Sequence, residues 1–445
     1  MFRNKRILII GLGISGQSAA HLLLKEQAIV YGTDRQLSLL KTKLDIQLLQ
    51  EKGLHLYEET ALPPLNTFDR VVLSPGVPFT HPLVQQAHAL NIPCLGEIAL
   101  GCLFVKHSLI GITGTNGKTT VTLLTTHVLN YWQQSAKALG NVGVPLTQEV
   151  LTLKPNDKIV LELSSYQLES LDQPLFDAGV ILNITPDHLD RYQTMENYAK
   201  AKYRLAACLK PNAFLYVEEQ TFQDYRKLLT SPAIRLYGYK PTSFIYTDLI
   251  TVYRDGQRAF ELPPLLQGYS NHEVDNLLAA FALCAEQGIS GKQFIQAWHS
   301  FQKPPHRIQF ILEHQGVKFI DDSKGTNIDA VTRAVQSLRG QIVLIAGGVD
   351  KGAPYTPWLQ VFKDKVKSIC AIGQAAAKIK AQLSPIIPVI ICQTLEEAVQ
   401  QAGQQAVSGD YVLLSPGCSS FDMFKDYVHR GEEFQKAVCA LTKGG

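Results

Sequence analysis

Gly114-Thr115-Asn116-Gly117-Lys118-Thr119-Thr120 is the stretch that decides how this chain folds. A short apolar run, Ser108 to Thr113, precedes it, and a helical pattern follows it at Val121, Leu124, Val128 and Leu129. This layout predicts a strand, a glycine loop and a helix, where backbone N–H groups and the helix N-terminus cradle phosphate. Lys118 would add a positive charge and Thr119 a hydroxyl for Mg²⁺. The stretch therefore predicts a nucleoside triphosphate site.

The loop departs from the standard phosphate-loop pattern G-x-x-x-x-G-K-[ST] at one position. That pattern requires glycine at position 112, where this chain has Ile112. A variant loop narrows the choice of family. The plain alternative is a glycine turn that happens to precede Lys118 and Thr119, and the flanking strand and helix patterns weigh against it.

Length and composition set the broad class. A chain of 445 residues suggests about three domains of ~150 residues each. Hydrophobic residues make up 46% and charged residues 18%, which allows sizeable cores and argues against disorder. The 42 basic and 39 acidic residues are dispersed along the chain, giving a net charge of +3. This balance argues against a nucleic-acid-binding protein.

The cysteines and the apolar segments indicate a compartment. None of the 8 cysteines forms a C-x-x-C pair, a usage that suits buried thiols in a reducing environment. Cys418 lies in a Gly/Ser loop, where a passive role is favoured over a reactive one. The first apolar run ends at Gly11, too early for a signal peptide, and no run approaches the ~20 residues of a membrane span. We expect a soluble cytoplasmic protein without membrane contact.

Strand and helix patterns alternate along the chain. In the first hundred residues, strands are predicted at 6–10, 28–32 and 70–73 and a helix at 18–24. The second part has predicted strands at 158–161 and 178–182 and helices at 196–209 and 276–285. The last third has predicted strands at 317–320, 341–346, 368–372 and 410–414. Such alternation predicts parallel sheets with crossover helices.

These patterns predict an α/β chain with three domains. The expected domains are an N-terminal Rossmann-like domain over 1–98, a central P-loop domain with a parallel sheet over 99–303, and a C-terminal Rossmann-like domain over 304–445.

A second glycine motif opens the chain. Gly11-Leu12-Gly13-Ile14-Ser15-Gly16 is a G-x-G-x-x-G directly after a predicted strand, and Asp34 follows the next strand. A dinucleotide, another diphosphate ligand such as a nucleotide sugar, and a purely structural turn all fit this pattern. Because the chain already has an ATP loop and no dehydrogenase-like constellation, a nucleotide-diphosphate substrate is favoured.

Several polar residues of the middle third are candidate ligands. Glu162 ends a strand and is well placed to hold Mg²⁺, with a capping carboxylate as the alternative. His188 follows the next strand, where a histidine satisfied by loop hydrogen bonds is the alternative. On the residues alone, Lys202 reads as a solvated helix lysine and Asn276 as a polar residue near a helix N-terminus.

The last third carries four polar loops, at 305–307, 321–327, 347–352 and 415–422. Ligands of parallel sheets bind beyond the carboxyl ends of the strands. The loops supply cations and hydroxyls, a mix that suits phosphates and carboxylates in a transfer reaction. The residues are Arg307, Lys324, Lys351, Ser323, Thr326, Ser419 and Ser420. Any single loop could be only a polar turn, but several on one face make that less plausible.

Residues 113–120 resemble the phosphate loop of the Mur ligases, the ATP-dependent amino-acid-adding enzymes of peptidoglycan synthesis. Residues 321–327 and 415–421 are similar to motifs of the member that adds D-glutamate to UDP-N-acetylmuramoyl-L-alanine. The Asp-Asn-Pro-Arg motif of the diaminopimelate-adding relative does not occur in this sequence. The related folylpolyglutamate synthases place their ATP loop near the N-terminus, whereas here a complete Rossmann-like unit precedes it, as expected for a UDP-binding domain. The resemblance covers essentially the whole chain.

The resemblance implies ATP and two Mg²⁺ ions. It places Lys118 on the ATP phosphates, within the binding loop Gly114 to Thr120. Thr119 and Glu162 would hold one Mg²⁺, and His188 and Lys202 the second. Lys202 would be carbamylated, which turns a cation into an anion able to bind a divalent metal. The matching adenine, ribose and phosphate contacts are Asn276, Arg307 and Asp322.

The resemblance also implies substrate contacts. Those at the uridine end are Ser15, Gly16, Asp34 and Arg35, and those beside the diphosphate are Ser74 and Gly76. Asn141 would contact the UDP-sugar. The matching D-glutamate contacts are Lys324, Thr326, Lys351, Ser420 and Phe421.

The expected activity is therefore ligation of D-glutamate to UDP-N-acetylmuramoyl-L-alanine through an acyl phosphate, by a monomer. One alternative is another Mur ligase or a folylpolyglutamate-type ligase. A different class is an NAD(P)-dependent dehydrogenase built on Gly11 to Gly16, which leaves the ATP loop unexplained. A third class is an NTP-dependent binding or regulatory module.

Overall fold

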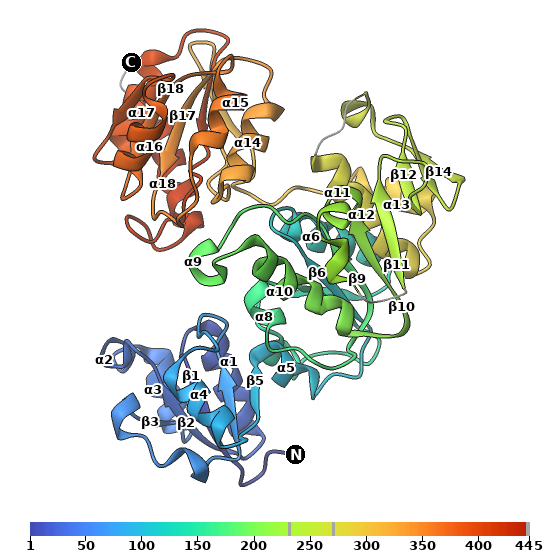
Figure 1. The fold of residues 1–445 in the computed structure, drawn as a ribbon, viewed down its shortest axis with the longest axis vertical. Helices are drawn as coiled ribbons and strands as arrows, with labels where there is room; N and C mark the ends of the chain where they lie inside the picture. The colour runs from blue at the N-terminus through green and yellow to red at the C-terminus, as the bar shows by residue number, and fades with distance from the viewer. Residues whose placement is uncertain (230–232, 269–271, 442–445) are drawn as a thin grey trace. The chain divides into compact units, whose positions relative to one another are not determined.

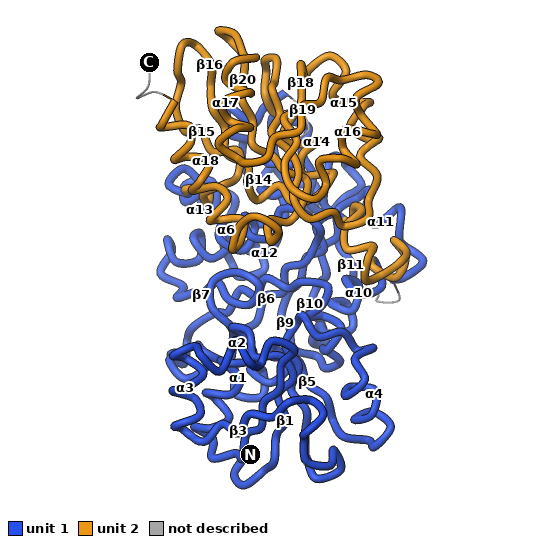
Figure 2. Tube along the Cα trace, turned by 90° about the vertical axis from the view of Figure 1, so that its left-hand side faces the viewer, with its two compact units in different colours: residues 1–183, 199–301 blue, residues 184–198, 302–445 orange. Residues whose placement is uncertain are grey.

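The computed structural model describes residues 1–229, 233–268 and 272–441. The chain forms two compact units (Figure 2). The first consists of Met1–Asn183 and Ala199–Phe301, and the second of Ile184–Tyr198 and Gln302–Gly445. The first unit contains two sheets and the second contains one.

The N-terminal sheet has five parallel strands in the order β3-β2-β1-β4-β5 (Figure 1). The strands are β1 Arg6–Ile10, β2 Ile29–Thr33, β3 His55–Leu56, β4 Arg70–Leu73 and β5 Cys94–Gly96. The helices are α1 Ile14–Lys25, α2 Leu37–Leu40, α3 Leu44–Glu51, α4 Pro82–Ala89 and α5 Glu97–Cys102. Helices α1 and α3 pack on one face of the sheet and α4 on the other. Since both faces are covered, the strands read as continuous apolar runs.

The central sheet has nine strands in the order β14-β13-β12-β11-β10-β9-β6-β8-β7. The strands are β6 Leu109–Thr113, β7 Ala136–Gly140, β8 Lys158–Glu162, β9 Phe176–Ile181, β10 Leu209–Glu218, β11 Ile234–Gly238, β12 Ile245–Thr247, β13 Thr251–Arg254 and β14 Gln257–Glu261. The strands from β7 to β12 pair in parallel, whereas β12, β13 and β14 pair antiparallel.

Seven helices accompany the central sheet among the described residues of the first unit: α6 Lys118–Tyr131, α7 Leu146–Glu149, α8 Ser165–Leu168, α10 Met195–Ala207, α11 Glu219–Tyr225, α12 His272–Glu286 and α13 Gly291–Trp298. Of these, α10 begins within the stretch that groups with the second unit. Helices α6, α12 and α13 share one apolar core with the sheet. Helix α12 is apolar nearly all round, which is typical of a helix buried in a large core.

The sheet of the second unit has six strands in the order β15-β16-β20-β17-β18-β19. The strands are β15 Gln309–His314, β16 Val317–Asp321, β17 Ile342–Gly347, β18 Val366–Ile372, β19 Val389–Ile391 and β20 Tyr411–Leu414, and only β15 is antiparallel. The helices are α9 Leu189–Tyr192, α14 Ile328–Ser337, α15 Leu359–Phe362, α16 Ala376–Leu383, α17 Leu395–Gln405 and α18 Tyr427–Leu441. Helices α14, α15 and α16 pack on one face and α17 and α18 on the other.

The predicted fold class, an α/β chain with two Rossmann-like parts around a P-loop part, is confirmed. The proposed domain limits 1–98, 99–303 and 304–445 stay a prediction. Ile184–Tyr198, within the predicted central domain, groups with the C-terminal part in the compact units. In the described part of the chain, no helix has both the length and the apolar character needed to span a membrane.

Candidate functional site

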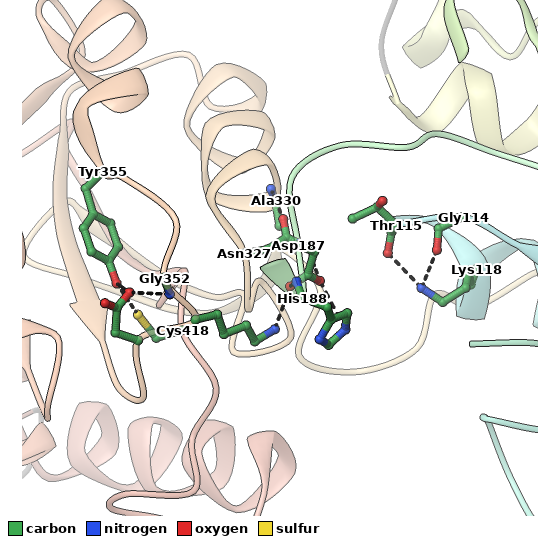
Figure 3. Close-up of polar contacts among 12 residues, drawn as sticks. Gly114, Thr115, Lys118, Asp187, His188, Asn327, Ala330, Gly352, Tyr355 and Cys418 are labelled. Carbon is green, nitrogen blue, oxygen red and sulfur yellow. Dashed lines mark hydrogen bonds and ion pairs between the residues drawn. The ribbon is translucent and has the colours of Figure 1, made fainter. Parts of the chain in front are cut away.

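The phosphate loop lies between β6 and α6, as predicted. Its tight turn depends on Gly117, which has φ +88° and where a Cβ would lie 2.2 Å from Asn276 Oδ1. A side chain at this position would be strained by the backbone and would clash with Asn276. The Lys118 ammonium donates hydrogen bonds to the carbonyls of Gly114 and Thr115, both at 2.8 Å (Figure 3). The loop therefore has the open glycine cradle and the nearby cation that suit a triphosphate.

Asn183 holds this loop in place, a role that the sequence did not suggest. Its Oδ1 accepts from the Asn116 amide at 2.9 Å, and its Nδ2 donates to the Asn116 carbonyl at 3.1 Å. The Thr115 amide donates to the Asn183 carbonyl at 2.7 Å. Only its position in the sequence could have indicated this role, because Asn183 follows β9, which pairs with β6.

Glu162 carries the strongest sign of a cation site. It ends β8 and pairs in register with Ile112, two residues before the loop begins. Asn141 Nδ2 donates to Glu162 Oε1 at 2.7 Å, whereas Oε2 is buried without a hydrogen-bond partner. A buried carboxylate oxygen without a partner is costly unless a cation or proton satisfies it. The residue fits the Mg²⁺ that the resemblance implies, and Thr119 lies in the first turn of α6 in the same unit.

The other two predicted metal ligands lie in different units. Lys202, on α10, is 1% exposed, and its Nζ donates to the Gly114 carbonyl at 2.8 Å. His188 belongs to the second unit, has φ +53°, and precedes α9. Among the described residues, no three His, Cys, Asp or Glu side chains are grouped as a metal site. A Mg²⁺ ion here would need phosphate, hydroxyl or water oxygens to complete its shell.

The N-terminal glycine motif forms a tight turn between β1 and α1. A Cβ at Gly16 would lie 1.9 Å from the Gly11 carbonyl oxygen, so only glycine fits there. Ser74 Oγ donates to that same carbonyl at 2.9 Å, linking the loops after β1 and β4. These two strands are adjacent at the point where the strand order reverses, which is where open α/β sheets bind ligands.

Asp34 supports this turn. Its two carboxylate oxygens accept from the amides of Leu12 and Gln36, at 2.7 and 2.8 Å. Ser15 is half-buried, and Arg35 and Gly76 are exposed at the same edge of the sheet. The predicted uridine and diphosphate contacts are thus brought together at one edge, and their roles stay a prediction.

In the second unit, the loops after β16, β20 and β17 lie side by side because these strands are neighbours. The Gly417 amide donates to the Gly325 carbonyl at 2.7 Å, and the Val349 amide donates to the Ser419 carbonyl at 2.9 Å. The sequence predicted this convergence of polar loops. These three loops carry all five predicted D-glutamate contacts: Lys324, Thr326, Lys351, Ser420 and Phe421.

These five residues differ in their surroundings. Lys324 Nζ lies 3.9 Å from the centre of the Tyr427 ring, a cation–π contact. Ser420 is buried and Thr326 half-buried, whereas Phe421 is 73% exposed.

Lys351 pairs with Asp187, a residue that the sequence did not single out. The Lys351 ammonium lies 3.1 Å from Asp187 Oδ1, and Asn327 Nδ2 donates to Asp187 Oδ2 at 3.4 Å. Asp187 precedes His188, and Figure 3 draws the two side chains together. These residues, except His188, line a pocket with Tyr355. A lysine and an amide on one carboxylate are the groups that would also recognise a ligand carboxylate.

Asp322, a predicted nucleotide contact, is buried. Its Oδ2 accepts from Ser415 Oγ at 2.7 Å, and its Oδ1 from the Ile308 amide at 3.3 Å. Burial raises the pKa of Asp322 to about 7, although these hydrogen bonds and the charge of Arg307 act in the opposite direction. Cys418 is also buried, with its thiol 3.0 Å from Tyr355 Oη, and burial raises its pKa to about 11. A passive thiol, as the sequence favoured, agrees with this environment.

The chain is similar to known proteins over its full length. The family model described as "Mur ligase MurD-like, N-terminal domain" matches residues 5–96, "Mur ligase middle domain" matches 112–284, and "Mur ligase, glutamate ligase domain" matches 306–418.

Two curated relatives cover nearly the whole chain. A protein of Protochlamydia amoebophila named UDP-N-acetylmuramoylalanine–D-glutamate ligase is 55% identical over 438 residues, 98% of each chain. A protein of the same name from Koribacter versatilis is 38% identical and covers 99% of this chain and 98% of its own. Among solved structures, the UDP-N-acetylmuramate-alanine ligase of Thermotoga maritima shares the fold, with a TM-score of 0.61 at 17% identity over 98% of this chain and 99% of that one.

Proposed function

The chain belongs to the Mur ligase family and is an ATP-dependent ligase, and from this premise we propose that it joins D-glutamate to UDP-N-acetylmuramoyl-L-alanine. The supporting observation is full-length similarity to relatives named for that reaction. The phosphate loop beside the buried carboxylate of Glu162 agrees with it. The reaction would be a step of peptidoglycan precursor synthesis in the cytoplasm, carried out by a monomer.

The proposed chemistry follows from the leaving group. A carboxylate cannot acylate an amine directly, because it would have to expel oxide. The L-alanyl carboxylate therefore attacks the γ-phosphorus of ATP, forming an acyl phosphate and releasing ADP. The amine of D-glutamate attacks the acyl carbon and loses a proton, and the tetrahedral intermediate expels phosphate to leave the amide.

Three residues of the first unit would serve the phosphoryl transfer, and a fourth orients one of them. Lys118, which donates to the Gly114 and Thr115 carbonyls, would turn toward the phosphate oxygens. Thr119 and Glu162 would hold Mg²⁺, and Asn141 orients Glu162 by donating to its Oε1. Bound Mg²⁺ neutralises charge on the transferring phosphoryl group.

Lys202 and His188 would hold a second Mg²⁺, which requires Lys202 to be carbamylated. An ammonium at this position would repel a divalent cation, whereas a carbamate supplies anionic oxygen ligands. Burial of Lys202 beside the phosphate loop supports a role beyond that of a surface lysine.

The remaining site residues would bind the three substrates. The nucleotide would contact Asn276, Arg307 and Asp322. The two carboxylates of D-glutamate suit the cations Lys324 and Lys351, with Thr326, Ser420 and Phe421 nearby. The UDP-sugar would bind along the N-terminal sheet edge, at Ser15, Gly16, Asp34, Arg35, Ser74 and Gly76. It would also contact Asn141, which follows β7 in the central sheet.

Phosphate release tests the proposal. The full chain is incubated with MgATP, UDP-N-acetylmuramoyl-L-alanine and, in separate reactions, D-glutamate, L-glutamate, L-alanine or meso-diaminopimelate. We expect release with D-glutamate only, and a product heavier by one glutamyl residue in mass spectrometry. The Lys118→Ala variant is the catalytic control, because loss of one such electrostatic contact typically costs ~3 kcal/mol in the transition state.

Other outcomes select the alternatives. Release only with another amino acid indicates a different Mur ligase, and release with a folate and L-glutamate indicates a folylpolyglutamate-type ligase. ATP hydrolysis that no amino acid stimulates indicates a regulatory module. Oxidation of NAD(P)H without use of ATP would point to a dehydrogenase.

A further inference from the structure

The buried Arg430 lies at the meeting point of the loops that carry the predicted amino-acid contacts. It belongs to the first turn of α18 and is 0% exposed. Fully buried arginines are rare, because the guanidinium must be paired inside the protein. The mechanism described above does not use it, and the sequence did not single it out.

The guanidinium donates to two of the three loops. Its Nε donates to Ser323 Oγ at 3.0 Å, and its Nη2 donates to the Ser323 carbonyl at 2.8 Å. Its Nη1 donates to the Cys418 carbonyl at 3.2 Å. Ser323 precedes Lys324, and Cys418 lies two residues before Ser420. One rigid fork thus joins the loop after β16 to the loop after β20.

The third loop packs against the same group. A Cβ at Gly348 would lie 3.3 Å from Arg430 Nη1, and Gly348 lies three residues before Lys351. Ser323 Oγ in turn donates to the Tyr427 carbonyl at 2.7 Å, which joins the loop after β16 to the start of α18. Arg430 therefore donates hydrogen bonds to the backbone near Lys324 and Ser420 and lies close to the backbone that precedes Lys351.

Arg430 keeps its charge although it is buried. Burial lowers its pKa to about 10, and electrostatic interactions with Cys418, Asp422, Asp321 and Asp322 oppose this shift. The side chain is thus still a cation at neutral pH, and its hydrogen bonds keep their charge-assisted strength.

We propose that Arg430 is a positioning residue of the amino-acid site, which sets the spacing of Lys324, Lys351 and Ser420 so that they match the two carboxylates of the incoming amino acid. This inference rests on the proposed function. The nucleotide contact Asp322 depends on it less, because Ser415, the Ile308 amide and the pairing of β16 with β20 hold that residue.

Steady-state kinetics of the full chain with Arg430→Lys test the inference. Lysine keeps the charge but cannot span the three acceptors. We expect KM for D-glutamate to rise about tenfold, the lower end of the effect of losing a supporting contact behind a site. KM for ATP and for UDP-N-acetylmuramoyl-L-alanine should stay within about twofold. A variant that only loses folded protein would instead show a lower kcat with all three KM values unchanged. Arg339→Lys, at an exposed position of the same unit, is the matched control.

A second variant keeps the test valid if Arg430→Lys does not fold. Ser323→Ala removes one acceptor and leaves the two backbone acceptors, so KM for D-glutamate should rise about three- to fivefold. An unchanged KM for D-glutamate in the folded variants, or an equal rise of all three KM values, overturns the inference. If the wild type shows no D-glutamate-dependent release, the proposed function itself fails, which is a separate outcome.

Discussion

Lys202 is buried, which is unusual for a lysine. Its side chain is 1% exposed, and its Nζ donates to the Gly114 carbonyl of the phosphate loop. Burial of a charged group costs free energy unless the group is paired. Both carbamylation and a plain structural hydrogen bond account for this burial. Only carbamylation predicts that a small carboxylate can replace the missing side chain in a variant.

Lys202→Ala should lower the ligation rate at least about 100-fold, the loss typical of one electrostatic contact in a transition state. Formate or acetate should restore part of the rate, because a small carboxylate can occupy the space of the carbamate. The measurement is phosphate release with and without added carboxylate. Lys200→Ala, an exposed neighbour on the same helix, should keep the wild-type rate. A fully active Lys202→Ala variant contradicts the carbamate.

Asp322 makes the stability of the second unit depend on pH. Its pKa is raised from 3.8 to about 7 by burial, so the folded state holds a proton that the unfolded chain releases near pH 4. Stability should therefore fall as pH rises from about 4 to about 7, and then level off. The free energy of unfolding should fall by at most about 4 kcal/mol, because each pKa unit of difference corresponds to about 1.36 kcal/mol.

Trp358 is a reporter for this prediction. It is fully buried in the second unit, and the other tryptophans, Trp132 and Trp298, lie in the first. In a chain with Trp132→Phe and Trp298→Phe, urea unfolding followed by fluorescence should show the decline with pH. Asp322→Asn should flatten it in that window. The same slope in the Asn variant would assign the dependence to another group.

For single residues, the sequence predicted the functional side chains that lie in recognisable motifs. It missed those whose importance is visible only from their contacts. Lys118 and Glu162 were predicted because their positions follow strands at a sheet edge. Asp187 and Arg430 were missed, because their partners are 164 residues away in one case and 107 in the other. A contact over such a separation has no local pattern.

At the scale of the element, the phosphate loop depends on one backbone conformation. Gly117 has φ +88°, which costs other residues about 1–2 kcal/mol, and an added Cβ would meet Asn276 Oδ1. Gly117→Ala should therefore weaken ATP binding at least about tenfold, with the backbone cost alone accounting for that factor. Binding of a fluorescent ATP analogue measures the change.

Gly256→Ala is the matched control for that variant. Gly256 also has a positive φ, +73°, but an added Cβ would meet nothing within 4 Å. It lies in the turn between β13 and β14, in the same unit. The control should lose a similar amount of local stability and keep its nucleotide affinity. Equal loss of affinity in both variants would show that the effect is not specific to the loop.

Strands that form continuous apolar runs were easier to predict than the others, which include β10 and β11 although these two also pair in parallel. The predicted strands at 6–10 and 70–73 match β1 and β4 residue for residue. Strands β10 to β14, over residues 209–261, were not predicted. Parallel strands covered on both faces read as apolar runs, whereas the burial pattern of β14 alternates too weakly to stand out in the sequence.

At the scale of the whole molecule, the predicted site residues are divided between two compact units. Lys118, Glu162 and Lys202 belong to the first, and His188, Asp322 and Lys351 to the second. Reacting atoms must come within about 3.5 Å of one another, so a productive complex needs one defined arrangement of the units. We predict that UDP-N-acetylmuramoyl-L-alanine with a non-hydrolysable ATP analogue narrows the range of arrangements.

Small-angle X-ray scattering with and without these ligands measures that change. The ligand-bound chain should have a smaller radius of gyration and a narrower distribution of interatomic distances. The Gly117→Ala variant at the same ligand concentrations should behave as the free chain. Identical profiles for the free and bound wild type contradict the prediction.

The sequence by itself determined what depends on short stretches of chain. Glycine positions set the two ligand loops, and continuous apolar runs set the parallel strands, because both act through neighbouring residues. The family and its chemistry were implied by a resemblance at residues 113–120, 321–327 and 415–421. Only the tertiary structure decided which polar groups are buried and what they contact: the unpartnered oxygen of Glu162, the pairing of Lys351 with Asp187, and the fork of Arg430. Burial and long-range pairing arise when distant segments pack together, and no local pattern encodes them.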